Sequence, residues 1–193
     1  MTRIIGGTAG GRRLETPRGS ATRPTSDRVR EALFSAIEAR TGSLDGLRFL
    51  DLYAGSGAVG LEAWSRGAGV VTMVEQDRRT AALISRNAST LGFSKARVIA
   101  ASVHTVLQTP PAASYDVVFS DPPYPMPDAD VAADLEALVA HGWLVPGALV
   151  IVERAAKRTQ VTWPDGIVED RTKRYGETTL WYGHATPAAS AES

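Results

Sequence analysis

The tetrapeptide Asp121-Pro122-Pro123-Tyr124 has the residue types for chemistry on an amino group. It directly follows the apolar run Tyr115–Ser120, which predicts a buried strand. The Asp121 carboxylate and the Pro122 carbonyl can both accept hydrogen bonds from one exocyclic amine of a nucleic-acid base, which would stabilise the positive charge that develops as the nitrogen attacks a methyl group. The prolines stiffen the turn, and the Tyr124 ring offers a face on which an extruded base can stack. The tetrapeptide therefore favours amine methylation over an ordinary Pro-rich turn, with adenine, cytosine, guanine and glutamine nitrogens all compatible.

A second segment has the composition of a cofactor loop. The apolar run Phe49–Leu52 leads into Tyr53-Ala54-Gly55-Ser56-Gly57, where glycine lets the backbone approach a ligand closely. Glu75 lies 20 residues after Gly55, where its carboxylate can accept both hydroxyls of an adenosine ribose. The spacing of Gly55, Gly57 and Gly60 also fits a dinucleotide-binding fingerprint, so the glycines alone leave both cofactors open. Asp51 favours S-adenosylmethionine (SAM), because an acid there can meet the cationic methionine amine.

The elements that must position these residues alternate between strand and helix from residue 48 to residue 153, which predicts an α/β fold with a parallel sheet. The expected strands are Arg48–Leu52, Val70–Glu75, Ala96–Ala100, Tyr115–Ser120 and Ala148–Glu153, and the expected helices are Ala58–Arg66, Arg78–Leu91, Val103–Leu107 and Ala129–His141. Three further strands without intervening helices, Gln160–Trp163, Val168–Tyr175 and Thr178–Tyr182, predict an antiparallel finish to the sheet. Ligands of open α/β sheets bind beyond the carboxyl ends of the strands, so both loops should face one crevice.

The chain before the sheet predicts a small appendage. Arg3–Gly7 and Gly10–Leu14 read as a short hairpin, and a helix follows that is capped by Thr25, Ser26 or Asp27. Its apolar positions are Val29, Leu33, Phe34 and Ile37. We therefore expect an N-terminal extension over residues 1–22, one domain over 23–184, and a tail over 185–193 that has too little apolar area to order itself.

Composition narrows the classes of protein. A chain of 193 residues that is 44% hydrophobic can bury one sizeable core. The absence of cysteine excludes disulfides and thiolate metal sites, and three scattered histidines argue against zinc, so no metal is expected. The N-terminus lacks the apolar stretch of a signal peptide, and no segment approaches the roughly 20 apolar residues of a membrane helix. The sequence thus predicts a cytoplasmic protein that does not enter the membrane.

Charge is distributed unevenly along the chain. Residues 1–30 hold seven arginines and two acids, a net charge of +5, so the remaining 14 basic and 19 acidic residues give −5. A basic arm on an acidic body suits a polyanion, although a solvated arginine-rich surface has the same composition. The phosphate-contact candidates are Arg12, Arg13, Arg23, Arg28 and Arg30.

These motifs together resemble the RsmD-type 16S ribosomal RNA guanine-N2 methyltransferases. The resemblance runs nearly end to end and rests on Arg3-Ile-Ile-Gly-Gly, Gly11-Arg-Arg-Leu, Arg23-Pro-Thr-Ser-Asp-Arg-Val-Arg-Glu-Ala-Leu-Phe34, Leu50-Asp-Leu-Tyr-Ala-Gly-Ser-Gly57, Asp121-Pro-Pro-Tyr124 and Tyr175-Gly176. The segment from Arg23 to Phe34 is the most specific, because other amino methyltransferases share the glycine loop and the Asp-Pro-Pro-Tyr loop. The resemblance implies a Rossmann-like SAM-dependent methyltransferase fold, with a mostly parallel seven-stranded sheet whose last strand is antiparallel.

It also implies a substrate and a set of site residues. The substrate would be N2 of one guanine of 16S ribosomal RNA, within an assembled or partly assembled small subunit. SAM would lie against Asp51, Tyr53, Ala54, Gly55, Ser56, Gly57, Glu75, Gln76, Ala101 and Ser102, and the guanine against Asp121 to Tyr124. Such enzymes commonly carry an acid after the third strand, but this chain has Ala100-Ala101-Ser102 there, so adenine would rely on backbone amides or Ser102.

Three other functions fit parts of the sequence. A DNA adenine-N6 or protein glutamine methyltransferase shares the Asp-Pro-Pro-Tyr loop, but the basic hairpin argues against a protein substrate, and 193 residues leave no room for a separate DNA-recognition domain. A non-catalytic nucleotide- or RNA-binding Rossmann module would not need Asp121 and Tyr124. An NAD-dependent oxidoreductase would need a hydride-transfer acid or base, and none follows Tyr124.

Overall fold

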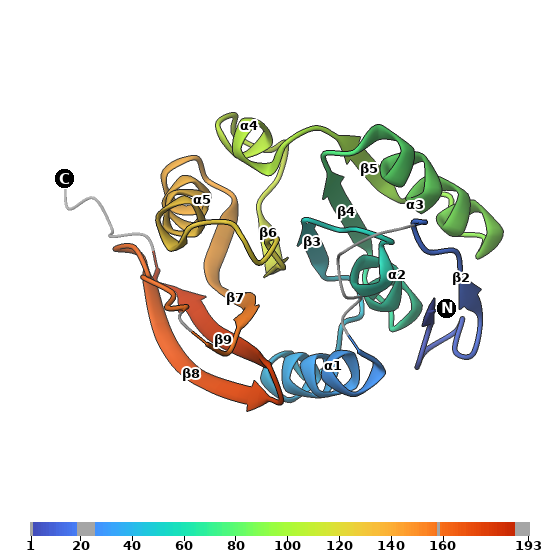
Figure 1. The fold of residues 1–193 in the computed structure, drawn as a ribbon, viewed down its shortest axis with the longest axis horizontal. Helices are drawn as coiled ribbons and strands as arrows, with labels where there is room; N and C mark the ends of the chain where they lie inside the picture. The colour runs from blue at the N-terminus through green and yellow to red at the C-terminus, as the bar shows by residue number, and fades with distance from the viewer. Residues whose placement is uncertain (1, 19–25, 158, 188–193) are drawn as a thin grey trace.

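The structure, a computed structural model, describes residues 2–18, 26–157 and 159–187. Its strands are β1 (Thr2–Arg3), β2 (Arg13–Leu14), β3 (Arg48–Leu52), β4 (Val70–Glu75), β5 (Arg97–Ala100), β6 (Tyr115–Ser120), β7 (Leu144–Ala155), β8 (Ile167–Tyr175) and β9 (Thr178–Ala185). Its helices are α1 (Asp27–Thr41), α2 (Ala58–Ser65), α3 (Arg78–Thr90), α4 (Val103–Leu107) and α5 (Asp128–Ala140). Figure 1 shows these elements along the chain.

Seven of the strands form one sheet in the order β5-β4-β3-β6-β7-β9-β8. The strands from β5 to β7 are parallel, as continuous apolar runs buried on both faces favour. β9 lies between β7 and β8 and is antiparallel to both. The predicted mostly parallel sheet with an antiparallel last strand is confirmed.

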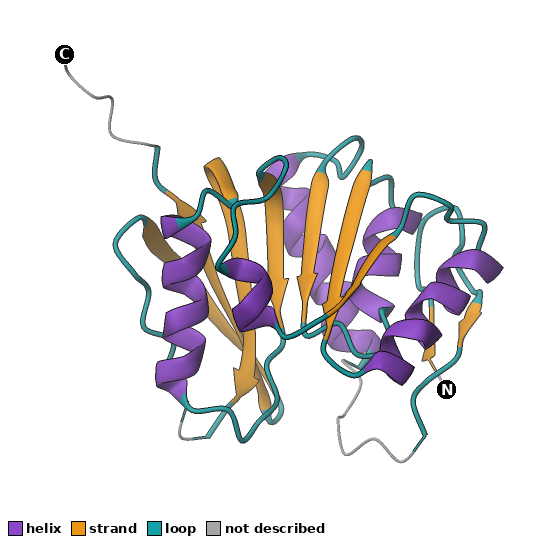
Figure 2. Cartoon of the chain, turned by 90° about the horizontal axis from the view of Figure 1, so that it is seen from above, coloured by secondary structure: helices purple, strands orange, loops and turns teal. Residues whose placement is uncertain are grey.

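Helices cover both faces of the sheet (Figure 2). One apolar cluster joins α1, α2 and α3 to the sheet, around side chains such as Phe34, Leu61 and Ile84. The other joins α4 and α5 to the opposite face, around Leu107 and Leu135. This sandwich leaves the loops at the carboxyl ends of the parallel strands to build a site.

Helix α1 begins as the sequence predicts. The Ser26 side chain accepts a hydrogen bond from the Val29 backbone N–H at 3.3 Å, so Ser26 is the capping residue. The four apolar positions at helical spacing, Val29, Leu33, Phe34 and Ile37, are buried.

Some expected elements differ from the structure. Gln160–Trp163 is an irregular loop and not a strand. Its apolar character reflects Val161, which is buried on the side of the sheet that α4 and α5 cover. The hairpin has regular strands only in β1 and β2, although Ile4 and Gly11 continue its hydrogen bonding. The tail expected from residue 185 begins inside β9, since Ala185 pairs with Ile167, and residues 188–193 lie outside the described part.

Two absences hold for the residues that the structure describes. None of their helices is both long and apolar enough to cross a membrane. Nor do their histidine, aspartate and glutamate side chains gather in groups of three or more that could hold a metal ion.

Candidate functional site

The glycine loop forms a tight turn between β3 and α2. Gly55 and Gly57 have φ angles of 57° and 81°, in the left-handed region that favours glycine. A Cβ atom on Gly57 would lie 2.9 Å from the Ile84 side chain, whereas one on Gly55 would meet nothing within 4 Å. The turn is therefore packed against α3 at Gly57 and is open at Gly55, so a ligand can approach its backbone there.

Glu75, at the end of β4, holds this turn in place. Its Oε1 accepts a hydrogen bond from the Gly55 backbone N–H at 3.0 Å, and its Oε2 accepts one from the Asp77 N–H at 2.7 Å. A carboxylate has about four acceptor sites, so lone pairs remain for the ribose hydroxyls that the sequence assigns to Glu75. The open face at Gly55 and this carboxylate together fit the adenosine half of SAM.

Asp51 is buried in the protein, whereas a residue that contacts a cofactor amine is expected to be accessible. It is 1% exposed, and its Oδ2 accepts a hydrogen bond from the Gly60 backbone N–H at 3.0 Å. Burial raises the pKa of Asp51 to about 7, the Gly60 N–H lowers it in part, and the charge of Glu75 raises it further. In the structure Asp51 fixes the first turn of α2 against β3, and its contact with the methionine amine remains a prediction.

Tyr53 connects the glycine loop to the other face of the sheet. It is the one described residue other than glycine with a positive φ, 59°. Its hydroxyl donates a hydrogen bond to Asp134 of α5, lies 3.4 Å from the Met126 sulfur, and has a raised pKa through burial and the neighbouring Asp134. Asp134 is 5% exposed, so this acid of α5 faces the interior of the protein.

The Asp-Pro-Pro-Tyr loop lies next to the glycine loop. β6 pairs with β3, and the Asp121 backbone N–H donates to the Leu52 carbonyl at 3.3 Å, one residue before the glycine loop begins. The strand order reverses between β3 and β6, which is where open α/β sheets bind ligands. The structure therefore brings the two predicted loops together at one edge of the sheet.

Within this loop the four residues differ in exposure. Asp121 is half-buried, Pro122 is buried and Pro123 is exposed. Tyr124 is 44% exposed, so its ring is available for stacking, and its hydroxyl lies 3.5 Å from Thr178 Oγ1 at the start of β9. The turn between β8 and β9 thus borders the loop.

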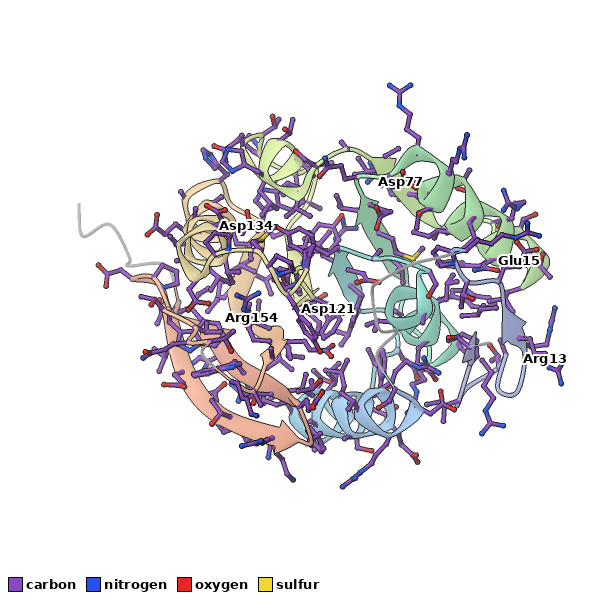
Figure 3. The ribbon with its side chains drawn as sticks, in the orientation of Figure 1. Arg13, Glu15, Asp77, Asp121, Asp134 and Arg154 are labelled. Carbon is purple, nitrogen blue, oxygen red and sulfur yellow. The ribbon has the colours of Figure 1, made fainter. Side chains whose placement is uncertain are left out.

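Arg154, near the end of β7, is a residue of this region that sequence reasoning missed (Figure 3). It is 1% exposed, and its Nη2 donates to the Met126 carbonyl at 2.8 Å and to Asp128 Oδ1 at 2.9 Å. A buried guanidinium requires such partners, so Arg154 anchors the segment between the Asp-Pro-Pro-Tyr loop and α5. The only sequence signal was a charged residue at the end of an apolar strand.

The ends of β4 and β5 offer less to an adenine than the other loops. Gln76, which follows β4, is exposed, and Ala101, which follows β5, is half-buried. The Ser102 hydroxyl caps α4, where it accepts from the Thr105 N–H at 3.2 Å and bonds the Thr105 hydroxyl at 2.7 Å. Of the two ways expected for holding adenine, the Ser102 side chain is therefore already engaged, and the backbone amides remain.

The N-terminal extension is tied to the domain by buried charges. Glu62 of α2 is fully buried and accepts hydrogen bonds from the backbone N–H groups of Ile5 and Gly6 at 2.8 and 2.9 Å. Arg30 is also fully buried, 3.3 Å from Glu62, and donates to the Arg3 carbonyl. The expectation that Arg30 contacts phosphate is therefore wrong for this conformation, because its guanidinium is inaccessible and paired.

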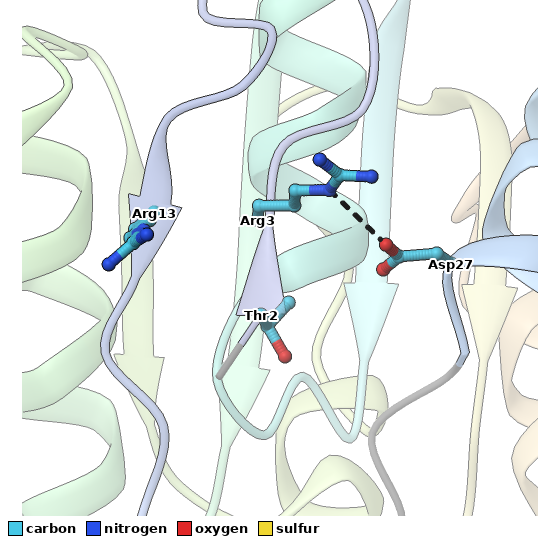
Figure 4. Close-up of a pocket in the computed structure, with 4 residues that line it drawn as sticks. All are labelled: Thr2, Arg3, Arg13 and Asp27. Carbon is cyan, nitrogen blue, oxygen red and sulfur yellow. Dashed lines mark hydrogen bonds and ion pairs between the residues drawn. The ribbon is translucent and has the colours of Figure 1, made fainter.

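The other phosphate-contact candidates lie on the surface, apart from Arg23, which is outside the described residues. Arg12, Arg13 and Arg28 are exposed, and Arg12 donates to the Thr90 carbonyl of α3 at 2.9 Å. Arg13 lines a surface hollow with Thr2, Arg3 and Asp27, in which Arg3 and Asp27 are paired at 3.4 Å (Figure 4). The basic character of the extension is thus presented outwards.

Asn87 of α3, which the sequence did not single out, links the extension to the glycine loop. Its side chain accepts from the Glu15 N–H at 2.9 Å and donates to the Glu15 carbonyl at 3.0 Å. Its amide also reaches the Ser56 carbonyl at 3.2 Å. Asn87 is 5% exposed, so these buried bonds fix the glycine loop and the extension relative to each other.

Comparisons with known proteins support a common family. Residues 2–184 match the family model described as Conserved hypothetical protein 95. The chain is 36% identical to ribosomal RNA small subunit methyltransferase D of Escherichia coli, over 91% of this chain and 85% of that protein. It is 38% identical to the protein of the same name from Haemophilus influenzae, over 83% and 82%.

Solved structures agree with the sheet topology. The structure of yhhF from Escherichia coli aligns with a TM-score of 0.84 at 32% identity, over 95% of this chain and 97% of that one. Magnesium protoporphyrin IX methyltransferase of Synechocystis, solved with bound SAM, has a TM-score of 0.62 at 15% identity, over 81% and 79%, and shows the fold alone. The chain belongs to the RsmD family, described as Conserved hypothetical protein 95, and is a SAM-dependent methyltransferase.

Proposed function

We propose that this protein transfers the methyl group of SAM to the exocyclic N2 amine of one guanine in 16S ribosomal RNA, within an assembled or partly assembled small subunit in the cytoplasm. The observation that carries the chemistry is the junction of β3 and β6, where the Asp121 N–H bonds the Leu52 carbonyl beside the glycine loop. The substrate class rests on the names of the relatives, which are ribosomal RNA small subunit methyltransferases. Guanine and its N2 rest on the resemblance carried by the segment from Arg23 to Phe34.

The proposed cofactor site follows the glycine loop. Gly55 and Ser56 would present backbone to SAM, and Glu75 would accept the ribose hydroxyls. Asp51 would act on the methionine amine from behind the turn, where its carboxylate is buried. When bound, SAM supplies an electrophilic methyl group on a sulfonium.

The proposed base site is the Asp-Pro-Pro-Tyr loop. The Asp121 carboxylate and the Pro122 carbonyl would accept hydrogen bonds from the guanine amine, and Asp121 would take its proton after transfer. The exposed Tyr124 ring would stack on the guanine. Orientation is the main catalytic contribution, because methyl transfer needs an in-line approach of the nitrogen. Among the arginines, Arg12, Arg13 and Arg28 would contact phosphate, and the same role for Arg23 stays a prediction.

The test is methyl transfer from labelled SAM to small-subunit particles purified from cells that lack the corresponding methyltransferase, followed by mapping of the modified nucleotide. We expect one labelled guanine, modified at N2. Asp121→Ala should reduce kcat by about 10²-fold or more, because it removes one of the two acceptors that stabilise the developing charge.

Other results would contradict the proposal in different ways. Activity on duplex DNA with inert particles would indicate a DNA amino methyltransferase. Tight NAD binding without SAM binding would indicate a non-catalytic nucleotide-binding module. Unchanged activity of Asp121→Ala would show that the Asp121 carboxylate does not take part in catalysis.

A further inference from the structure

Strand β8 forms one edge of the sheet, with β9 as its neighbour. The residues from Val168 to Arg174 are all exposed. The acids Glu169 and Asp170 come first, and the cations Arg171, Lys173 and Arg174 come last. Asp170 is paired with Arg40 at 3.3 Å and with His184 at 2.6 Å, so the first half of the strand carries a partly neutralised charge.

The last half of β8 keeps its positive charge. Arg171 lies over the Tyr182 ring, 4.9 Å from its centroid, and Arg174 Nε donates to the Gly176 carbonyl at 2.8 Å. Neither contact neutralises a guanidinium. Among the described residues, Arg171, Lys173 and Arg174 make no salt bridge. We call Arg171, Lys173 and Arg174 the β8 basic edge.

This basic edge leads directly to the proposed base site. β8 ends at Tyr175, which pairs with Thr178 of β9, and Thr178 Oγ1 lies 3.5 Å from the Tyr124 hydroxyl. Strands advance about 3.3 Å per residue and lie about 4.8 Å apart, so the backbone of Lys173 lies within roughly 18 Å of the Tyr124 hydroxyl. Phosphates close to a base stacked on Tyr124 would therefore be within reach of these long side chains.

The basic edge and the N-terminal hairpin lie on different sides of the proposed base site. In Figure 1, β1 and β2 lie at the right end of the long axis, whereas β8 runs from the left side to the bottom of the view, where its carboxyl half, which carries the basic edge, lies beside α1. An RNA strand that places a base at the junction of β3 and β6 can thus extend in two directions, towards Arg12 and Arg13 or towards β8.

We infer that the β8 basic edge binds phosphates of the RNA substrate on another side of the target base than the N-terminal extension. This inference rests on the proposed function and extends it to a second contact surface. Lysines and arginines on an edge strand also discourage pairing with another sheet. The test separates the two roles by using charge reversal, which keeps the edge charged.

The experiment measures methyl transfer by the full chain to unmethylated small-subunit particles, over a range of particle, SAM and salt concentrations. Lys173→Glu is the first variant, because the exposed Lys173 side chain makes no hydrogen bond or salt bridge within the described residues. Lys173→Glu with Arg174→Glu is the second. Lys95→Glu with Arg97→Glu is the matched control, because these exposed cations lie at the amino end of β5, on the opposite edge of the sheet.

We expect the double β8 variant to raise KM for particles about tenfold and to reduce the salt slope by about 0.7–0.9 per lost phosphate contact. KM for SAM and the thermal midpoint should not change, and the control should behave as the unaltered chain. Equal KM values for the β8 and control variants, or an unchanged salt slope, would overturn the inference while leaving the proposed function intact. Particles that the unaltered chain fails to methylate would instead contradict the proposed function.

Discussion

At the scale of single residues, Asp51 is a buried carboxyl group whose charged form is destabilised by burial. Its pKa is raised from 3.8 to about 7 in the folded protein, so the folded state binds the proton more tightly than the unfolded chain. The stability that Asp51 contributes is therefore fully present below about pH 4 and is lost as the pH rises through about 7. We predict that Asp51→Asn raises the thermal midpoint relative to the unaltered chain more at about pH 8 than at about pH 5, measured without cofactor.

The same variant should bind SAM more weakly at about pH 8, because the neutral amide cannot match the methionine ammonium. Calorimetry at that pH measures the loss. Parallel pH profiles of the thermal midpoint in both proteins would show that Asp51 does not titrate in this range, and the raised pKa would then be wrong.

At the scale of elements, helix α3 supports the glycine loop through the buried side chain of Asn87. Asn87 bonds the Ser56 carbonyl and both backbone groups of Glu15. Asn87→Asp keeps the side-chain oxygen that accepts from the Glu15 N–H, but it loses the amide N–H groups that donate to the Glu15 and Ser56 carbonyls. A buried carbonyl without a donor costs about 1–3 kcal/mol. We predict that it raises the Kd for SAM about tenfold, measured by calorimetry. Arg86→Ala is the control, since Arg86 lies on the same helix and is paired with the exposed Glu15 side chain at 3.4 Å. An equal effect of both variants would contradict a specific role of Asn87.

The prediction of helices and strands from the sequence was correct for some elements and wrong for others, for physical reasons. The bounds of β3, β4 and β6 follow from runs buried on both faces and ended by polar or glycine residues. The prediction of a strand at Gln160–Trp163 is wrong, because an irregular loop that buries one apolar side chain, here Val161, can have the same alternation of polar and apolar residues. Asn87 and Arg154 act through partners that lie 72 and 26 residues away, and no local pattern specifies such pairs.

At the scale of the whole molecule, the N-terminal extension is part of the core rather than a free arm. Ile4 and Leu14 are buried with residues of α1 and α2, and Glu62 accepts two of the extension's backbone N–H groups. Glu62 also meets Arg30 at 3.3 Å and Arg66 at 2.9 Å. The extension and the domain should therefore unfold in one transition, so that its basic surface keeps a fixed position relative to the base site.

Glu62→Gln tests this coupling, because it removes the charge that pairs two arginines. We predict a loss of about 3 kcal/mol or more in the free energy of unfolding, since the buried Arg30 would lose its one buried carboxylate partner among the described residues and keep only the half-exposed Asp27. Denaturant unfolding followed by both fluorescence and circular dichroism measures it. Glu38→Gln is the control, because Glu38 meets the same Arg66 at 3.4 Å with a 43% exposed side chain, and it should cost about 1 kcal/mol or less. Similar losses in both variants, or early proteolytic release of residues 2–18 from the folded unaltered chain, would show instead that the extension is held independently of the core.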